Sequence, residues 1–363
     1  MKKKVLIINI IRFSRYGIGA VIKNYCWRLK EHYEFDFLLC AGAEQENFDF
    51  IKQIGGRALT LRCSRNKQPI SYVVQLTKLI KKNKYDIVHV HGNSATMFFD
   101  IHAAKKAGVP MRIAHSHSSS GKYKMLHYVL KNPLSKEMTV GVACSEQAGR
   151  WAFEREFVVL NNAIETEKFS FNTSLRDELR EKYNLEDKFV LLNVGRLNRL
   201  KNQWFLLELL QSLSGSREDM VLVLIGDGEY EESLKIQAEK LKVTDKVLFL
   251  GKRDNIHDFY NIADMFVFPS EYEGFGLVLV EAQASGLVCV ASTGVPVETN
   301  ICDKVTYINV SDYMGWKNKL EEADRISDKS RMISSQNAIV KLKQNGYDVK
   351  LNAERLMNIY ENN

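Results

Sequence analysis

The 363-residue sequence lacks the features of secreted, membrane-spanning and disordered chains. Its six cysteines are scattered and form no Cys-x-x-Cys pair, so we expect neither a zinc site nor disulfides, and a cytoplasmic location. Five prolines are too few for a linker-rich chain. The longest apolar runs hold about seven residues, well short of the ~18 that cross a bilayer. The run Val5–Ile11 is also too short for a secretory signal, so a buried first strand is predicted there.

Complete phosphate-binding motifs are missing as well. Gly17-Ile-Gly19 and Gly226-Asp-Gly228 both stop short of Gly-x-Gly-x-x-Gly, and no Gly-x-x-x-x-Gly-Lys-Ser/Thr stretch is present. Dinucleotide binding and a P-loop are therefore not expected.

Charge is unevenly distributed along the chain. Residues 1–150 carry 25 Lys+Arg against 10 Asp+Glu, a net charge of +15, whereas residues 151–363 carry 26 against 34, a net charge of −8. This asymmetry predicts two domains with different partners. On charge alone, an anionic membrane surface, nucleic acid and a merely solvated basic face all fit the first half.

Short apolar runs rich in β-branched residues recur along the chain, with amphipathic segments between them. We expect strands at Val5–Ile10, Phe35–Cys40, Ile87–Val90, Met111–Ala114, Thr139–Cys144, Val158–Leu160, Phe189–Val194, Met220–Ile225, Lys246–Leu250, Met265–Pro269 and Leu287–Ala291. Because these runs do not alternate with polar residues, they predict parallel strands covered by helices on both faces. The predicted fold class is α/β, with two doubly wound parallel sheets.

Three segments are expected. A Rossmann-like domain spans residues 1–165, a second spans 166–345, and a helix spans 346–363, for which packing back on the first domain is the retained alternative. The polar stretch Asn161–Ser174 is the expected hinge. Ligands of open α/β sheets bind at the carboxyl ends of the strands, so we expect a cleft where the two sheets face each other.

The densest motif follows the strand that ends at Pro269. Glu273 lies in the loop, a helix is expected to begin near Gly276, and Glu281 lies one turn into it. The glycines allow close approach of a ligand, and the unpaired amides of the helix start suit a phosphate. A loop carboxylate and a second one that complements the helix dipole explain these residues equally well.

Cations follow the strand that ends at Val194. Gly195 permits a turn, and Arg196 and Lys201 lie in the loop that leads to the next helix. Arginine offers a planar fork to a phosphate and lysine a point charge. Surface residues are the alternative, but both lie at the carboxyl end of a strand.

The first half contributes two histidine pairs, His89-Val-His91 and His115-Ser-His117, each at the end of a strand. A spacing of two residues on a strand does not readily make a zinc site, although it places His115 and His117 on one face. Packing or hydrogen bonding is the leading interpretation of each pair, with a ligand contact as the alternative.

Together these motifs resemble the retaining glycosyltransferases of family 4, which have the GT-B fold of two Rossmann-like domains. The resemblance rests on Arg196 with Lys201 and on Glu273 with Glu281, separated by seven residues, and it covers the chain from Val5 to Tyr360. It is strongest toward bacterial exopolysaccharide and capsule glycosyltransferases.

The resemblance implies a role for each matching residue. Arg196 and Lys201 would hold the diphosphate of a nucleotide sugar, Glu281 the ribose and Glu273 the donor sugar, while His117 would act on the sugar from the other domain. The donor-binding set implied in full is Gly17, Gly19, Arg196, Lys201, Arg253, Glu273, Gly274, Phe275, Gly276, Leu277 and Glu281. Two departures are the loop Tyr16–Val21, where the family often has Gly-Gly-x-Glu, and Gly294–Glu298, where Pro and Glu are usually adjacent.

The implied activity is transfer of a hexose from a UDP-sugar, rather than a GDP-sugar, to a glycan acceptor. No Asp-x-Asp motif is present, so cations and the helix start would stabilise the departing diphosphate without a metal or cofactor. A nucleotide-sugar epimerase of the same fold and a non-catalytic nucleotide-sugar binding protein are the rival interpretations.

The resemblance also implies a partner for the basic half, namely a polyprenyl-diphosphate-linked glycan at the inner face of the cytoplasmic membrane. The segment Lys122–Lys136 mixes basic residues with aromatic and aliphatic ones, which favours peripheral binding to an anionic membrane surface. An ordinary solvated amphipathic helix is the alternative, and nucleic acid is not expected.

Overall fold

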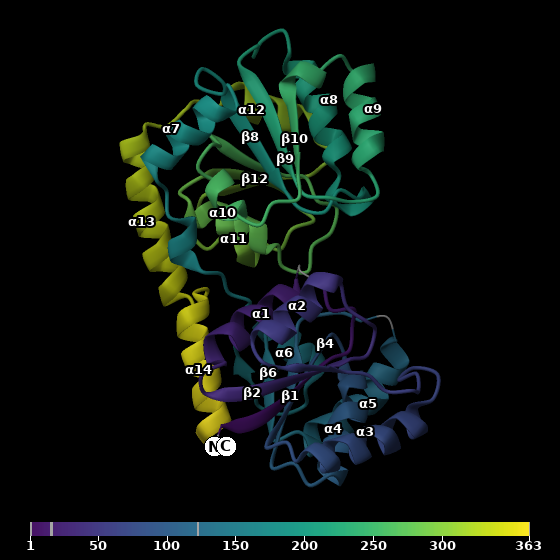
Figure 1. Ribbon diagram of the computed structural model, residues 1–363. Coiled ribbons are helices and arrows are strands. Elements are labelled where there is room, and N and C mark those ends of the chain that lie inside the picture. The colour runs from purple at the N-terminus through teal and green to yellow at the C-terminus, as the bar shows by residue number, and fades with distance from the viewer. Residues whose placement is uncertain (1, 15–16, 122, 363) are drawn as a thin grey trace. The chain divides into compact units, whose positions relative to one another are not determined.

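The computed structural model describes residues 2–14, 17–121 and 123–362. The chain divides into two compact units, the first formed by residues 1–163 and 349–363 and the second by residues 164–348 (Figure 1). The division lies two and three residues away from the boundaries expected at 165 and 345. The C-terminal helix α14 (Val349–Asn362) belongs to the first unit, where it packs against α1.

The first unit contains a parallel sheet of seven strands in the order β3-β2-β1-β4-β5-β6-β7. Its strands are β1 (Lys3–Asn9), β2 (Tyr33–Leu39), β3 (Arg57–Leu59), β4 (Ile87–Gly92), β5 (Met111–Ser116), β6 (Val140–Ala143) and β7 (Val158–Val159). Its other helices are α1 (Ile18–Leu29), α2 (Gln45–Gln53), α3 (Pro69–Asn83), α4 (Phe98–Lys106), α5 (Lys124–Glu137) and α6 (Glu146–Ala152), with a short 3-10 helix η1 (Ala95–Met97).

Alternation along the strands sends side chains of the first unit into two helical layers. Leu6 and Ile8 pack among side chains of α3, α4 and α5, whereas Ile7 faces a small cavity lined from α1 and α14. Both faces of the sheet are therefore buried, as the unbroken apolar runs predict.

The second unit contains a parallel sheet of six strands in the order β10-β9-β8-β11-β12-β13. Its strands are β8 (Phe189–Val194), β9 (Met220–Ile225), β10 (Val247–Gly251), β11 (Met265–Phe268), β12 (Val288–Ser292) and β13 (Val305–Ile308). Its helices are α7 (Thr173–Lys182), α8 (Gln203–Leu213), α9 (Glu231–Lys240), α10 (Ile256–Phe259), α11 (Leu277–Ala284), α12 (Tyr313–Glu321) and α13 (Asp328–Gln344). The 3-10 helices are η2 (Thr166–Phe169), η3 (Arg199–Lys201), η4 (Thr244–Lys246) and η5 (Val297–Thr299).

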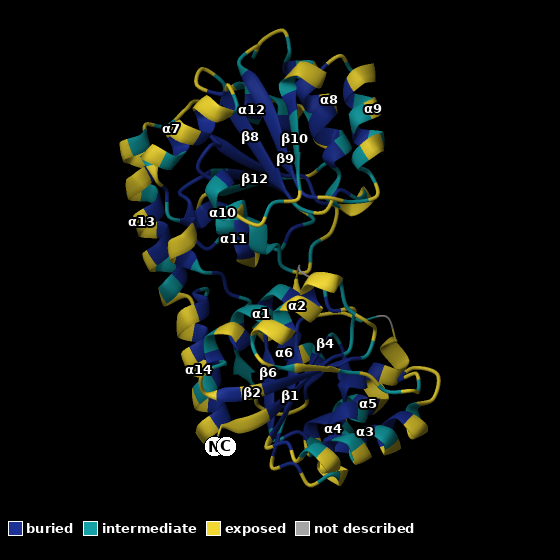
Figure 2. Ribbon diagram, in the orientation of Figure 1, coloured by how far each residue is buried: buried dark blue, intermediate teal, exposed yellow. Residues whose placement is uncertain are grey.

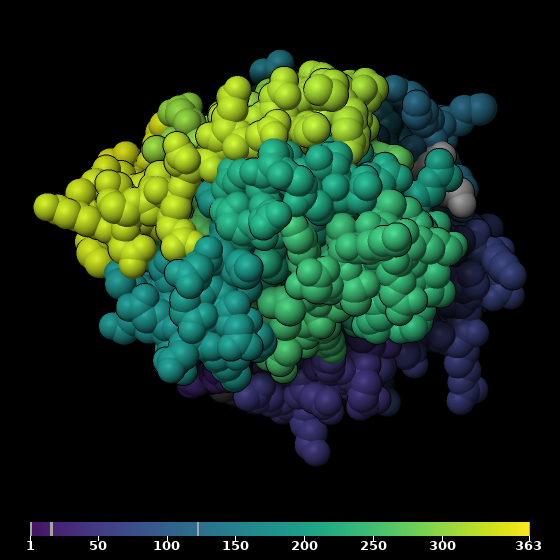
Figure 3. Space-filling model, turned by 90° about the horizontal axis from the view of Figure 1, so that it is seen from above, coloured from purple at the N-terminus to yellow at the C-terminus, as the bar shows by residue number. Residues whose placement is uncertain are grey.

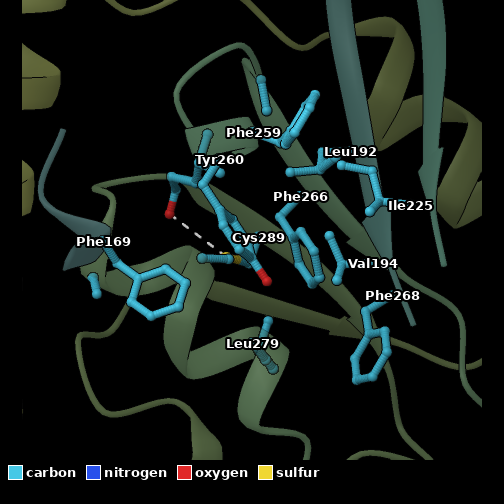
Figure 4. Packing of buried hydrophobic residues seen from close by; sticks show 14 of the residues in the cluster. Phe169, Leu192, Val194, Ile225, Phe259, Tyr260, Phe266, Phe268, Leu279 and Cys289 are labelled. Carbon is cyan, nitrogen blue, oxygen red and sulfur yellow. Dashed lines mark hydrogen bonds between the residues drawn. The ribbon is translucent and has the colours of Figure 1, made fainter. Parts of the chain in front are cut away.

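Two separate cores fill the second unit. Val190 and Leu192 pack with the aromatic cluster drawn in Figure 4, while Phe189 and Leu191 pack toward α8 and the buried Trp316 of α12. In both units the central strands are largely buried, and most of the exposed residues lie in helices, loops and the edge strand β3 (Figure 2). Figure 3 presents one side of the second unit, where surface side chains coloured teal to yellow conceal the sheet.

The predicted α/β class with two doubly wound parallel sheets is confirmed. Two strands that the sequence analysis does not predict, β3 and β13, lie at the edges of the two sheets. Among the described residues, no helix combines the length and the apolar character needed to span a bilayer.

Candidate functional site

The loop between β11 and α11 presents an open helix start. Gly276, at the N-cap of α11, has a φ of 89°, which glycine adopts without strain, and no side chain caps the first amides of the helix. A Cβ at Gly276 would lie 3.3 Å from the ring of Phe268. Uncapped N–H groups together with the helix dipole favour an anion at this point.

Lys201 and Glu273, predicted from separate motifs, are brought together. The Lys201 ammonium donates to Glu273 Oε1 in an ion pair and lies 4.9 Å from the ring centre of Phe268. Both side chains are largely buried, with exposures of 21% and 12%. Each charge neutralises the other, so an incoming phosphate would compete with Glu273 for Lys201.

Backbone hydrogen bonds fix the two loops that carry this pair. The amide of Glu271 donates to Leu200 O at 2.8 Å, and the amide of Glu273 donates to Gly294 O at 3.0 Å. The side chain of Asn198 accepts from the Lys201 amide at 3.1 Å and starts the turn η3. The ends of β8 and β11 therefore hold the site as one rigid edge of the sheet.

Arg196 does not join this pair. Its guanidinium is 60% exposed and lies 3.3 Å from Glu229 in a surface ion pair. Such an exposed pair contributes little to stability, so Arg196 can turn toward a ligand at small cost. The neighbouring Gly226 is required for packing rather than for a ligand, because a Cβ there would lie 1.9 Å from Gly195 O.

Glu281 projects from the second turn of α11. Its carboxylate accepts a hydrogen bond of 2.7 Å from the hydroxyl of Tyr260, a fully buried residue that the sequence analysis does not single out. Burial raises the pKa of Glu281 to about 7, and the hydrogen bond from Tyr260 acts in the opposite direction. This carboxylate therefore titrates near neutrality.

Two further donor-site residues have apolar contacts in the second unit. The guanidinium of Arg253 lies 5.6 Å from the ring centre of Phe259, and its buried Nε has no hydrogen-bond partner in the described part of the chain. The ring of Phe275 stacks on Tyr347, with centres 5.6 Å apart and planes 8° apart. Gly274 has open space where a Cβ would be.

The four strand-end histidines of the first unit form one buried cluster. His91 Nδ1 and His117 Nε2 lie 2.9 Å apart, and His89 Nε2 and His115 Nδ1 lie 3.2 Å apart. His117 Nδ1 donates to Asn162 Oδ1 at 3.2 Å. Because that bond fixes its proton, His117 Nε2 accepts from His91, and both ring nitrogens of His117 are occupied.

Burial keeps this cluster uncharged. It lowers the pKa of His89 to about 3 and that of His117 to about 4, and the pKa values of His91 and His115 lie well below the ordinary range for the same reason. The neighbouring imidazoles add to the lowering for His89, His91 and His115.

Three of these residues could in principle hold a metal, because His89, His91 and His115 offer ring nitrogens within 4.8 Å of one another. The rings of His89 and His91, however, are stacked, with centres 4.1 Å apart. A metal must lie in the plane of each ligating ring, so stacked rings cannot share one without rotating. The arrangement therefore suits hydrogen-bonded pairs, the leading interpretation from the sequence.

The glycine loop of the first unit precedes α1. Gly17, the N-cap of α1, has a φ of 56°, and a Cβ at Gly19 would lie 1.8 Å from Ser14 O, so neither position accepts a larger residue without change. Tyr16, in the same loop, lies outside the described residues. Gly17, Gly19 and His117 belong to the first unit, and the other predicted site residues belong to the second.

The sequence motifs do not indicate which side chains hold the predicted site residues. Tyr260 bonds to Glu281, Asn162 bonds to His117, and the hydroxyl of Tyr360 lies 2.7 Å from His89 Nδ1. No short motif joins these pairs, because the partners are 21, 45 and 271 residues apart. Tyr260 follows α10 directly, in the connection from that helix to β11, where no local pattern draws attention to it.

Two doubly wound parallel-sheet units, one with basic side chains and carboxylates around an uncapped helix start, are the architecture of a GT-B glycosyltransferase. Comparison with known families agrees. Residues 176–342 match the family described as glycosyl transferases group 1, and residues 16–168 match glycosyltransferase family 4. The chain belongs to the family 4 glycosyltransferases.

Individual relatives are similar over most of the chain. EpsF of Bacillus subtilis (strain 168), which carries the name of a glycosyltransferase, is 31% identical, covering 99% of this chain and 96% of that protein. The Escherichia coli UDP-Gal:alpha-D-GlcNAc-diphosphoundecaprenol alpha-1,3-galactosyltransferase is 28% identical, covering 79% and 78%. HepE of Anabaena, solved in complex with UDP, has a TM-score of 0.81 at 17% identity and 99% coverage of both chains, which shows the shared fold.

Proposed function

We propose that this glycosyltransferase is a retaining hexosyltransferase that uses a UDP-sugar and acts on a polyprenyl-diphosphate-linked glycan in exopolysaccharide or capsule synthesis. The observation that carries the donor proposal is the placement of Lys201 beside the open start of α11, with Arg196 on the same strand end. Both cations are held there by ion pairs, with Glu273 and Glu229, which a diphosphate would have to replace. The Escherichia coli relative, named for an undecaprenyl-linked acceptor, supports the choice of acceptor, and HepE, solved with UDP, supports the choice of base.

In the proposed reaction, the bond from the anomeric carbon to the diphosphate oxygen breaks as the acceptor hydroxyl forms its bond on the same face. The acceptor proton passes to an oxygen of the departing phosphate. Lys201, Arg196 and the amides of Gly276 and Leu277 take up the growing negative charge, so no metal is required. Splitting the ion pair with Lys201 frees Glu273 for the hydroxyls of the donor sugar.

In the first unit, the proposed contacts are those of His117 with the donor sugar and of Gly17 and Gly19 near the diphosphate and acceptor. The ring nitrogens of His117 already bond to His91 and Asn162. The proposed contact of His117 with the donor sugar therefore requires one of these two hydrogen bonds to open.

The proposed membrane surface is the outward face of α5. Its exposed apolar side chains lie one helical turn apart, and the most exposed are Met125, Tyr128 and Val129. Lys124 is exposed on the same helix, whereas Lys131 is engaged with Glu154 at 3.1 Å and with Arg150 O. Lys122 lies outside the described residues. An apolar face beside exposed lysine supports peripheral binding at the inner face of the cytoplasmic membrane.

One experiment tests the donor, the chemistry and the metal together. The chain is incubated with a panel of UDP- and GDP-sugars and a polyprenyl-diphosphate-linked saccharide, with and without excess EDTA, and nucleotide release is measured. We expect release with a UDP-sugar only when acceptor is present, unchanged by EDTA, and NMR should show the donor's anomeric configuration in the product.

Other outcomes would redirect the assignment. Conversion of the free nucleotide sugar without acceptor would favour an epimerase, and binding without turnover would favour a non-catalytic binding protein. Loss of activity in EDTA that Mg²⁺ or Mn²⁺ restores would overturn the metal-independent mechanism.

A further inference from the structure

The environment of Glu281 contains one residue that the reaction outlined above does not use. Tyr260 precedes β11, its side chain is completely buried, and its hydroxyl lies 2.7 Å from Glu281 Oε2. The hydroxyl oxygen of Tyr260 also lies 3.3 Å from the carbonyl oxygen of Val278, in the first turn of α11. A phenol has a single proton, and the shorter contact to the carboxylate identifies where it is donated.

The Tyr260 ring cannot move away from this position easily. Phe169 meets it edge-on with ring centres 5.5 Å apart, and Phe266 lies 5.9 Å away on the neighbouring strand (Figure 4). The three rings belong to the closed core beneath α11. A rotation of Tyr260 would leave a void in that core, so the hydroxyl is a fixed donor.

The carboxylate of Glu281 is satisfied on one side only. Oε2 accepts from Tyr260, and within the described residues no other side chain donates to this carboxylate. Oε1 is not fully enclosed either, because a buried Oε1 without a partner would count among the buried unpaired polar atoms, and it does not. One oxygen is therefore anchored and the other is left for a ligand.

We propose that Tyr260 is a positioning residue for the nucleotide: its hydroxyl holds Glu281 in the orientation in which Oε1 accepts hydrogen bonds from vicinal hydroxyls of a ribose. The inference rests on the proposed function, which places the ribose at Glu281. It adds a residue, deep in the core and away from the ligand, that acts through the carboxylate.

The same hydrogen bond stabilises the charged form of Glu281. Burial raises the pKa of Glu281 to about 7, and Tyr260 lowers it. Removing the phenol oxygen should therefore raise this pKa further, so that more of the carboxyl is protonated at pH 7. A protonated carboxyl accepts hydroxyl hydrogen bonds more weakly than a carboxylate, and nucleotide binding should fall with it.

No charged neighbour offers an alternative cause. On the elements that pack against α11, most ionisable groups have partners elsewhere: Lys168 with Glu165, Lys343 with Glu167, Lys341 with Asp303, Asp328 with Arg176, and Arg331 with backbone carbonyls. Lys329 and Glu298 are exposed, and the thiol of Cys289 is buried.

The test compares UDP binding by calorimetry between pH 5.5 and 9 in the wild-type chain, Tyr260→Phe, Glu281→Gln and Tyr307→Phe. Tyr307 is the matched control, because its hydroxyl bonds to Thr299 and Pro296 O in the same unit. In the wild type, affinity should fall as pH falls through about 7. In Tyr260→Phe, the midpoint of this pH dependence should move up by about one pH unit. The variant should bind UDP roughly 3–10-fold more weakly than the wild type at pH 7, and the difference in affinity should be smaller at pH 9.

The variants separate the two hypotheses. Glu281→Gln should bind UDP more weakly than the wild type above pH 7, approach it at pH 5.5 and lose the midpoint near 7, and Tyr307→Phe should match the wild type. If Glu281→Gln binds like the wild type, or if the wild type binds neither UDP nor GDP, the proposed nucleotide site is wrong. If Glu281→Gln weakens binding but Tyr260→Phe moves neither affinity nor midpoint, the positioning role is overturned while the nucleotide site stands. Thermal unfolding of each variant verifies that it is folded.

Discussion

At the scale of single residues, the ion pair of Lys201 with Glu273 makes a sharp prediction. Lys201→Ala removes a cation aimed at the departing diphosphate, which typically costs ~3 kcal/mol of transition-state stabilisation, or on the order of 10²-fold in rate. Arg196→Ala should have an effect of similar size, although its exposed pair with Glu229 contributes little to folding. Turnover with a UDP-sugar is the measurement, and Arg199→Ala, an exposed arginine in the same turn, is the control. Wild-type turnover in either variant would remove that residue from the site.

His117 makes a second prediction at this scale. His117→Ala should lower sugar transfer strongly while leaving the affinity for free UDP nearly unchanged, because its proposed contact is with the sugar. The variant also leaves His91 and Asn162 without a buried partner, so unfolding must be measured alongside. Asn162→Ala, which removes only the bond that fixes the tautomer, should lower transfer less. Equal loss of transfer and of UDP affinity would indicate a structural role for His117 and make His115 the better candidate.

At the scale of secondary structure, helix α5 carries the membrane hypothesis. Each basic residue near an anionic bilayer contributes about 1 kcal/mol, and the apolar face of Met125 and Val129 adds burial. Co-sedimentation should show binding to anionic vesicles that weakens with salt and drops when Lys122 and Lys124 are changed to Glu. Lys131→Glu is a poorer probe because that lysine already pairs with Glu154. A chain that ignores anionic vesicles at low salt would favour a soluble acceptor.

Individual strands and helices show which parts of the fold can be predicted from the sequence. Strands such as β8 and β9 are predicted from runs of six apolar or amide residues, and the structure buries every residue of both runs. The edge strand β3 has only exposed or half-buried residues, and β13 only half-buried ones, so neither carries a local signal. The helix start near Gly276 is predicted from the glycine-containing loop after the strand that ends at Pro269, but the partners of Lys201 and Glu281 depend on packing between distant segments.

At the scale of the whole molecule, the first unit carries four neutral histidines in its core, and this makes its stability depend on pH. In the unfolded chain each histidine has a pKa of about 6.5. In the folded chain burial lowers the pKa of His89 to about 3 and that of His117 to about 4, with His91 and His115 lowered for the same reason. The unfolded state therefore binds more protons below about pH 6.5. The stability that the first unit gains from keeping these histidines neutral is fully present above that pH and is lost as the pH falls toward 4.

The size of this loss is large enough to measure. Each such histidine can remove up to about 1.4 kcal/mol per pH unit, so four remove at most about 5.6 kcal/mol per unit, against a typical folding free energy of about 5–15 kcal/mol. We expect the urea midpoint of the first unit to fall steeply between pH 6 and 4. His115→Gln should be less stable at pH 7 yet show a shallower decline, because one titrating group is gone, whereas exposed His32→Gln should keep the wild-type slope. A wild-type midpoint that stays constant from pH 7 to 4.5 would mean that these imidazoles gain protons over the same pH range in the folded and the unfolded chain. The stacked, hydrogen-bonded arrangement would then have to be abandoned, since each bond within it needs a neutral acceptor nitrogen.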